Sequence, residues 1–212
     1  MAQGVSPLDT AHRGPVHAAQ LDHFGKRLAT ASADHTVRVW EVGGGTRHFV
    51  AELKGHAGPV WTVAWAHPMN GPMLASAGED CHVVIWREAE GGEWCQVHRH
   101  RVQGAIMVIT FSPWEYGLHL AVASCDGRVT VLSFREPIGD EVQQALSEPP
   151  SPQMQSSPTV TSIQSMHGER WLVESLPVAH DGGVFAVCWA PATSPQIIDN
   201  IQPVAVLSDR RV

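Results

Sequence analysis

The chain has 212 residues, of which 43% are hydrophobic, enough for one packed domain or a part of a larger one. Its formal net charge of −7 argues against a protein that binds nucleic acid directly by neutralising phosphates. The four cysteines form no C-x-x-C pair, and no stretch resembles a signal peptide or a membrane span. We therefore expect reduced thiols and a location in the cytosol or nucleus.

Two units of four short strands are predicted after a flexible N-terminal lead-in at residues 1–11. In the first unit, residues 12–54, strands are predicted at 15–21, 27–32, 36–41 and 47–53. In the second unit, residues 55–100, they are predicted at 60–65, 74–77, 83–86 and about 94–99.

The third unit, residues 101–176, contains an interruption. Its strands are predicted at 105–111, 118–124, 128–134 and 171–176. Asp126-Gly127 is predicted to form a tight two-residue turn, because both positions tolerate positive φ. Residues 136–168 are rich in Ser, Pro and Gln and cannot bury enough apolar area to offset their ordering entropy, so they are predicted to be a disordered insert.

The fourth unit, residues 177–212, is incomplete. It starts at His180, its strands are predicted at 184–189 and 204–208, and Asp209 would begin its second turn. A sheet cut at this point leaves unpaired backbone groups along an exposed edge. We therefore expect the sequence to be a fragment or a truncated form of a longer protein.

The units repeat with a constant period. Two sets of equivalent positions step by 46 residues: the turn residues Asp34, Asp80 and Asp126, and the third-strand ends Trp40, Trp86 and Leu132. A period in the mid-forties with four short strands per unit is typical of WD-repeat blades. The sequence therefore predicts an all-β fold, a WD-repeat β-propeller of about three and a half blades.

Each of the first two blades has a histidine, a hydroxyl residue, an aspartate and a tryptophan at matching positions. These are His12, Thr30, Asp34 and Trp40 in the first blade and His56, Ser76, Asp80 and Trp86 in the second. The residue types are also those of a hydrolase triad. Because a triad does not recur in every blade, we interpret both sets as structural hydrogen-bond networks that fix the turns, and we predict no catalytic residue.

Two further features suggest ligand sites. The chain has 13 histidines, and His98 and His100 would share one face of a strand. No third ligand is evident nearby, so we expect an exposed histidine pair and no metal or cofactor. Trp61, Trp65 and Trp189 on the first strands would form a stacking platform or, as we expect, pack in the core.

Beyond the repeat, the sequence resembles the Sec-thirteen (SEC13) family. The shared pattern is GPVW at 58–61, VAWAHPM at 63–69 and VIWRE at 84–88, with DTAH at 9–12, RLAT at 27–30, YGL at 116–118 and VCWAP at 187–191. The resemblance covers nearly the whole chain except residues 136–170. The sister family, Seh-one, shares the Trp-Ala-His-Pro element but fits the surrounding residues less well.

The resemblance implies a non-enzymatic scaffold subunit of the COPII coat, which acts in transport from the endoplasmic reticulum to the Golgi, and of the nuclear pore complex. Family members form an open six-bladed propeller that receives a blade from a partner, a Sec-thirty-one-type coat subunit or a Y-complex nucleoporin. Val16, Ala18 and Gln20 on the first strand are the candidate contacts of that blade. The implied location is the cytosol, the nuclear envelope and the cytoplasmic side of the endoplasmic reticulum and its vesicles, with membranes reached only through partners.

Two alternatives remain open from the sequence. A WD-repeat adaptor would recognise a peptide on the top face of the propeller, and convergent arginines on its loops would favour this function, but the sequence shows no such cluster. A Seh-one-type scaffold of the nuclear pore and of nutrient signalling is the second alternative.

Overall fold

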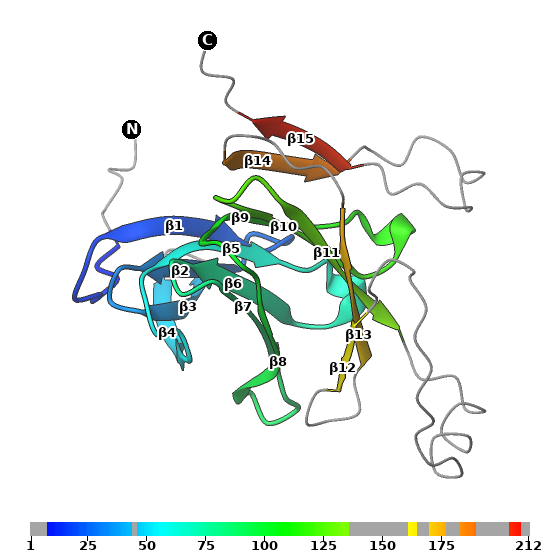
Figure 1. Ribbon diagram of the computed structural model, residues 1–212. Helices are drawn as coiled ribbons and strands as arrows, with labels where there is room; N and C mark the ends of the chain where they lie inside the picture. Colours follow the sequence, from blue (N-terminus) through cyan, green and yellow to red (C-terminus); the bar gives the residue numbers. More distant parts are fainter. Residues whose placement is uncertain are drawn as a thin grey trace, which may run out of the picture.

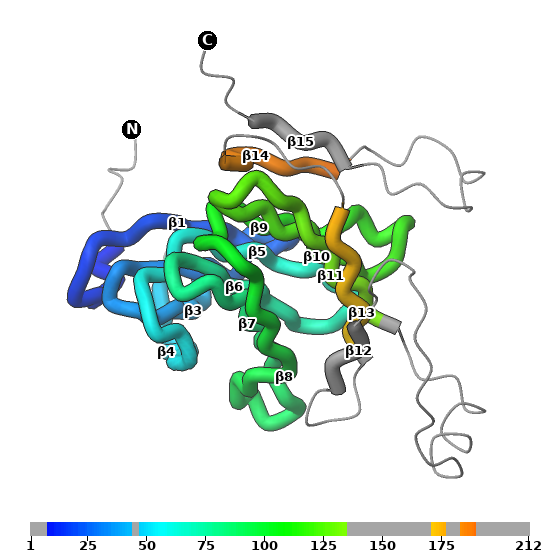
Figure 2. Tube along the Cα trace, viewed as in Figure 1, coloured from blue at the N-terminus to red at the C-terminus, as the bar shows by residue number. Residues whose placement is uncertain are grey.

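The structure is a computed structural model that describes residues 8–43, 46–135, 161–164, 170–176, 183–189 and 204–208. Within these ranges the chain forms antiparallel sheets and two 3-10 turns, η1 (Pro68–Asn70) and η2 (Trp114–Tyr116). Neither turn is long or apolar enough to cross a membrane. The first strands of successive sheets lie next to one another and the later strands fan outwards, as in a partial, open propeller (Figures 1 and 2).

The first two blades are four-stranded sheets in which each strand pairs with the next. The first blade consists of β1 (Val16–Leu21), β2 (Arg27–Ser32), β3 (Thr36–Gly43) and β4 (Thr46–Lys54). The second consists of β5 (Val60–Trp65), β6 (Met73–Gly78), β7 (His82–Glu88) and β8 (Trp94–Arg101). The WD-repeat propeller fold predicted from the period is thus confirmed.

The third blade has an additional strand. It consists of β9 (Ile106–Phe111), β10 (His119–Ser124), β11 (Val129–Arg135), β12 (Thr161–Gln164) and β13 (Arg170–Ser175), and β12 pairs with β13 at the edge of the sheet. The prediction of disorder was wrong at Thr161–Gln164. Pairing at an edge supplies backbone hydrogen bonds without requiring a large apolar area, which the composition argument did not consider.

The fourth blade is described through β14 (Val184–Trp189) and β15 (Val204–Ser208), which pair with each other and match the predicted strands. His180 and Asp209 lie outside the described residues, as does the rest of the segment 136–168.

The turn after β10 differs in detail from the prediction. Gly127 has a φ of 82°, but Asp126 is not in the positive-φ region, and the N–H of Gly127 bonds to the carbonyl of Ser124. The equivalent positions of the first two blades, His35 and Cys81, also have positive φ, at 68° and 60°. All three turns therefore need one left-handed residue after the aspartate, and the expectation of two was wrong.

The blades pack face to face, with an apolar core at each interface. Because side chains alternate between the two faces of a strand, neighbouring residues of β6 belong to different cores. Leu74 packs towards the first blade, whereas Met73 and Ala75 pack towards the third, and all three are 0% exposed. A smaller core around Val129 and Val184 joins the third blade to β14. Each sheet is thus positioned by its neighbours.

Candidate functional site

The polar network of the second blade joins all four predicted residues. The imidazole of His56 contacts the Asp80 carboxylate through Nδ1, at 3.0 and 3.1 Å, and Ser76 Oγ through Nε2, at 2.8 Å. Trp86 Nε1 donates a hydrogen bond to the same Ser76 Oγ at 2.8 Å. Ser76 is 0% exposed and Trp86 3% exposed, so the network lies in the interior.

The charges of this network fit a structural role. Burial lowers the pKa of His56, although the Asp80 carboxylate opposes this shift. Burial raises the pKa of Asp80, but hydrogen bonds from the N–H groups of Ala57 and His82 and the charge of His56 outweigh it, so that the pKa lies below its usual value. The carboxylate thereby ties the loop before β5 to the turn before β7. The serine, histidine and aspartate have the order of a hydrolase triad, but the serine hydroxyl is covered.

In the first blade the network joins three of the four predicted residues. His12 contacts Asp34 Oδ2 through Nδ1 and Thr30 Oγ1 through Nε2, both at 2.9 Å. Trp40 Nε1 is buried without a partner among the described residues, and the ring packs edge-to-face on Phe49, with centroids 5.3 Å apart.

The residue before the histidine differs between the two blades. In the second blade the ring of Trp86 packs on Gly55, where a Cβ atom would lie 2.9 Å from Trp86 Cη2. The matching residue of the first blade is Ala11, which carries that Cβ atom and has a φ of 49°. Gly55, unlike Ala11, is not in the positive-φ region, so both the side chain and the backbone differ where Trp86 packs, and the residue types of the network did not indicate this.

The outward-facing surface of the first blade differs from the prediction. Ala18 packs in the core shared with the second blade, and Gln20 accepts two hydrogen bonds from Trp65, one to its side chain at 3.1 Å and one to its carbonyl at 2.9 Å. These two residues therefore face the second blade, and their assignment to a partner interface was wrong. A register shift between Val16 and Ala18 changes which face of the sheet the following side chains of β1 lie on. Val16, before the shift, pairs with Ser32 and is 42% exposed.

The opposite face of the first blade, which we call the open face, carries an apolar row across all four strands. Direct cross-strand pairs connect its members in the order Leu21, Leu28, Trp40 and Phe49. Leu21 and Phe49 are each 53% exposed. The apolar core to which this blade contributes lies on its other side, against the second blade. The open face therefore presents Leu21 and Phe49 to solvent, whereas Leu28 is half-buried and Trp40 is 8% exposed.

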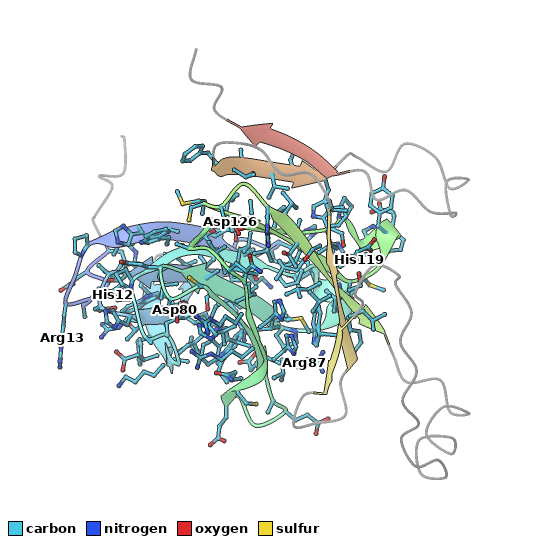
Figure 3. The ribbon with its side chains drawn as sticks, in the orientation of Figure 1. His12, Arg13, Asp80, Arg87, His119 and Asp126 are labelled. Carbon is cyan, nitrogen blue, oxygen red and sulfur yellow. The ribbon has the colours of Figure 1, made fainter. Side chains whose placement is uncertain are left out.

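Beside the apolar row, charged groups cross the outer strands of the open face. Arg38 bonds to Glu52 at 2.8 Å and to the carbonyl of Thr10 at 2.9 Å, and Lys54 approaches Glu52 to 2.5 Å. Hydrogen bonds from Lys54 and Arg38 lower the pKa of Glu52. The row and this cluster make the open face amphipathic. Figure 3 draws the side chains of the chain and labels His12 and Arg13 of the first blade.

The histidine pair of β8 was predicted to be exposed, and this prediction was wrong. His98 is 3% exposed and stacks on Trp171 of the third blade, with ring centroids 5.6 Å apart, and His100 is half-buried. Burial lowers the pKa of His98 to about 4. Among the described residues no group of three or more side chains could hold a metal ion. The sequence did not reveal this packing, because Trp171 follows the long insert.

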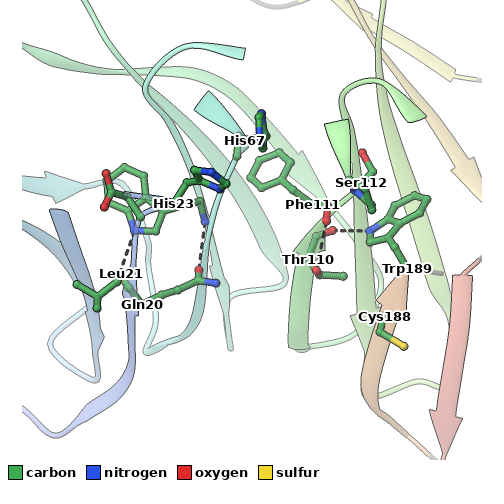
Figure 4. Close-up of a pocket in the computed structure, with 13 residues that line it drawn as sticks. Gln20, Leu21, His23, His67, Thr110, Phe111, Ser112, Cys188 and Trp189 are labelled. Carbon is green, nitrogen blue, oxygen red and sulfur yellow. Dashed lines mark hydrogen bonds between the residues drawn. The ribbon is translucent and has the colours of Figure 1, made fainter. Parts of the chain in front are cut away.

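The tryptophans that end the first strands link neighbouring blades. Trp65 Nε1 donates to the carbonyl of Gln20 at 2.9 Å, and Trp189 Nε1 donates to the carbonyl of Thr110 at 3.1 Å (Figure 4). Gln20 and Thr110 occupy the same position in β1 and β9. The sequence signal for these links was the recurrence of tryptophan at the end of a first strand, which we interpreted only as core packing.

Comparisons with known proteins agree with this architecture. Residues 5–41 and 47–87 match the WD40 family, described as "WD domain, G-beta repeat". "Protein transport protein sec13" of Emericella nidulans is 36% identical over 211 residues, which cover 95% of this chain and 57% of that protein. "Protein SEC13 homolog" of Drosophila melanogaster is 35% identical over 196 residues, which cover 92% and 46%.

A further relative, "Protein transport protein SEC13" of Mycosarcoma maydis, is 35% identical over 228 residues, which cover 96% of this chain and 54% of that protein. The chain thus spans about half the length of the curated relatives it matches. Blades, networks and sequence identity agree, and the chain belongs to the SEC13 family of WD-repeat proteins.

Proposed function

We propose that this chain is a non-enzymatic scaffold subunit that receives a β-blade from a partner protein on the open face of its first blade. The proposal places it in the COPII coat and in the nuclear pore complex. The relatives named as protein transport proteins support a role in vesicle transport.

The observation that carries the proposal is a comparison of the first two blades. Leu74 and Trp86 of the second blade are 0% and 3% exposed because the first blade covers them. Their counterparts in the first blade are Leu28, which is half-buried, and Trp40, which is 8% exposed. The residues paired with them at the ends of the row, Leu21 and Phe49, are each 53% exposed. The first blade therefore carries the same kind of apolar surface that a neighbouring sheet buries on the second blade. A partner sheet placed there would bury the apolar row.

A partner that fits this surface supplies a β-sheet whose apolar face covers the apolar row. We propose a Sec-thirty-one-type subunit in the coat and a Y-complex nucleoporin in the pore. The chain would then act in the cytosol, on the cytoplasmic side of the endoplasmic reticulum and at the nuclear envelope, with membranes contacted through these partners.

The test is co-expression of the 212-residue chain with the blade-donating segment of a Sec-thirty-one-type subunit, followed by size-exclusion chromatography. We expect co-elution in a one-to-one complex for the unmodified chain and loss of the complex for the double variant Leu21→Asp and Phe49→Asp. A charge at either position would be buried without a partner in the complex.

The matched control is Phe185→Asp, which changes a residue of similar exposure, 56%, on β14 of the fourth blade. This variant is expected to co-elute like the unmodified chain. Undiminished co-elution of the double variant would show that the open face does not receive the partner.

A catalytic function has less support. A hydrolase would need the Ser76 hydroxyl to reach a substrate, and this group is covered and bonded to Trp86. We therefore propose that the network of the second blade acts in folding alone.

A further inference from the structure

The loops between the first and second strands of the blades carry large apolar side chains into solvent. Phe24, Met69 and Trp114 lie in the loops of the first, second and third blades and are 64%, 75% and 53% exposed. The ring of His23 lies 5.2 Å from that of Phe24 and 4.9 Å from that of His67. The ring of His67 in turn lies 6.3 Å from that of Trp114. We call the four rings the aromatic ridge: Phe24, His23, His67 and Trp114.

The three loops are held by their own hydrogen bonds. In the first blade the Asp22 carboxylate accepts two backbone N–H groups, at 2.7 and 3.0 Å. In the second blade η1 closes through Gly71, whose N–H bonds to the carbonyl of Pro68 at 3.0 Å. In the third blade η2 closes in the same way, from Gly117 to Trp114, also at 3.0 Å. The ridge is therefore ordered before any partner binds, which reduces the entropic cost of binding.

Two hollows adjoin the ridge, and His23 lines both of them. One, of about 350 Å³, lies between the first and second blades. Its apolar lining includes Phe24, Trp65, Pro68, Pro72 and Met73, and the charged residues Asp22, Lys26, Arg27 and Glu41 also line it. The other, of about 470 Å³, lies towards the ends of the first strands and is lined by both histidines and by Phe111 and Trp189 (Figure 4). Hollows of this size accommodate a few side chains each.

The chemistry of the surface distinguishes between the common ways of binding a peptide. Strand addition needs a free backbone edge, but the N–H groups that close these loops are already bonded. An amphipathic helix needs a continuous apolar groove, whereas the ridge divides this surface into two hollows. A polyproline II segment needs neither a free strand edge nor a continuous groove. Its backbone forms no internal hydrogen bonds, and its proline rings pack on aromatic faces.

One histidine also supplies a hydrogen-bond donor for such a segment. The Nδ1 atom of His67 accepts the N–H of Met69 at 3.3 Å. The tautomer that accepts this bond carries its proton on Nε2, and this N–H group can donate to a free carbonyl of a polyproline II backbone. The indole N–H of Trp65, by contrast, is bonded to Gln20, so this ring offers the hollow an apolar surface.

From these features we propose that the aromatic ridge and the hollow between the first and second blades bind a proline-rich segment of a partner protein in the polyproline II conformation. Phe24 and Trp114 pack against proline rings, and His67 donates to a peptide carbonyl between them. This surface is formed by loop residues other than those of the apolar row, so its test does not depend on the partner blade.

The test is a titration of the 212-residue chain with a synthetic decaproline peptide, followed by tryptophan fluorescence and by two-dimensional NMR. We expect saturable binding, with NMR shifts confined to the loops of the ridge. Phe24→Ser and Trp114→Ser are each expected to weaken binding about tenfold, which corresponds to about 1.4 kcal/mol. His67→Phe, which keeps an aromatic ring but removes the Nε2 donor together with the Nδ1 acceptor of the Met69 N–H, is expected to weaken it about threefold.

Two controls accompany the titration. Phe185→Ser removes an equally exposed phenylalanine from β14 and is expected to bind decaproline like the unmodified chain. A decapeptide of alternating glycine and serine is expected not to bind. Phe24 and Trp114 are 64% and 53% exposed, so thermal unfolding of the two serine variants is expected to match that of the unmodified chain.

Three results would overturn the proposal. The first is the absence of saturable decaproline binding, and the second is binding that neither Phe24→Ser nor Trp114→Ser weakens. The third is self-association of the unmodified chain that Phe24→Ser abolishes in sedimentation, because the ridge would then be an interface between two copies of this chain.

Discussion

At the scale of single residues, the absence of a Cβ atom at Gly55 leaves room for the polar network of the second blade. Gly55 allows the ring of Trp86 to lie close to the backbone, where its N–H reaches Ser76. Ala11 holds the matching sequence position in the first blade with a positive φ of 49°, and Trp40 Nε1 remains without a partner among the described residues. The glycine that precedes the histidine of a WD repeat thus has a physical role, which is to make room for an indole ring.

Gly55→Ala is therefore expected to destabilise the chain. The new Cβ atom would lie 2.9 Å from Trp86 Cη2, so the ring must move and its hydrogen bond to Ser76 is lost. We expect a loss of about 1 to 3 kcal/mol in the free energy of unfolding, measured by urea denaturation. Gly91→Ala is the control, because a Cβ atom there meets nothing within 4 Å, and it is expected to change stability by less than about 0.5 kcal/mol. Equal stability of the two variants would contradict the role assigned to Gly55.

At the scale of secondary-structure elements, the packing of the outer strands β8 and β13 makes the chain sensitive to acid. His98 of β8 is buried against Trp171 of β13, and its Nε2 atom has no partner among the described residues. Burial lowers the pKa of His98 to about 4, and burial followed by the charge of His82 lowers the pKa of His100. Both rings are therefore neutral in the folded chain near neutral pH.

This packing predicts a stability that falls as the pH falls. Above about pH 6.5 His98 is neutral in the folded and unfolded states, whereas between pH 6.5 and about 4 only the unfolded state gains the proton. The free energy of unfolding is therefore expected to fall by roughly 2 kcal/mol from this group alone between pH 7.5 and pH 5. His98→Phe keeps a ring of similar size without a titratable group and is expected to flatten this part of the profile.

Urea denaturation at pH 7.5 and pH 5 measures the effect. The comparison variant is His48→Phe, which replaces an exposed histidine on β4 and is expected to keep the full pH dependence. If His98→Phe loses as much stability at pH 5 as the unmodified chain, the buried ring is not the source of the acid sensitivity.

At the scale of the whole molecule, specific polar contacts add to the apolar cores in holding the blades together. Trp65 bonds to Gln20 across the first interface, and Trp189 bonds to Thr110 across the third. Arg27 and Glu88 add a two-point ion pair between the first and second blades, with N–O distances of 2.5 and 3.2 Å. These contacts fix the order and spacing of the sheets, and with them the position of the open face.

Trp65→Phe is expected to weaken the interface between the first and second blades. It keeps an aromatic ring but removes the N–H that bonds to the Gln20 carbonyl, so we expect a loss of about 1 to 2 kcal/mol, measured by thermal or urea unfolding. Trp114→Phe, at a site that is 53% exposed, is the control and is expected to be nearly neutral. A neutral Trp65→Phe would mean that the apolar core alone holds this interface.

Local sequence patterns determined the strands and the membership of the polar networks. The 46-residue step, the short apolar runs and the glycine-rich turns are features of neighbouring residues, and they placed β5, β14 and β15 at their observed bounds. The same patterns brought His56, Ser76, Asp80 and Trp86 together, because each recurs at a fixed distance within one blade.

The tertiary structure decided what depends on contacts between blades. A register shift in β1 turned Ala18 and Gln20 towards the second blade, and Trp171, more than seventy residues further along the chain, buried His98. The sequence alone therefore established a propeller and its repeated blades. Which side chains remain open to a partner was decided by packing, because exposure depends on residues that are distant in the sequence and close only in the folded chain.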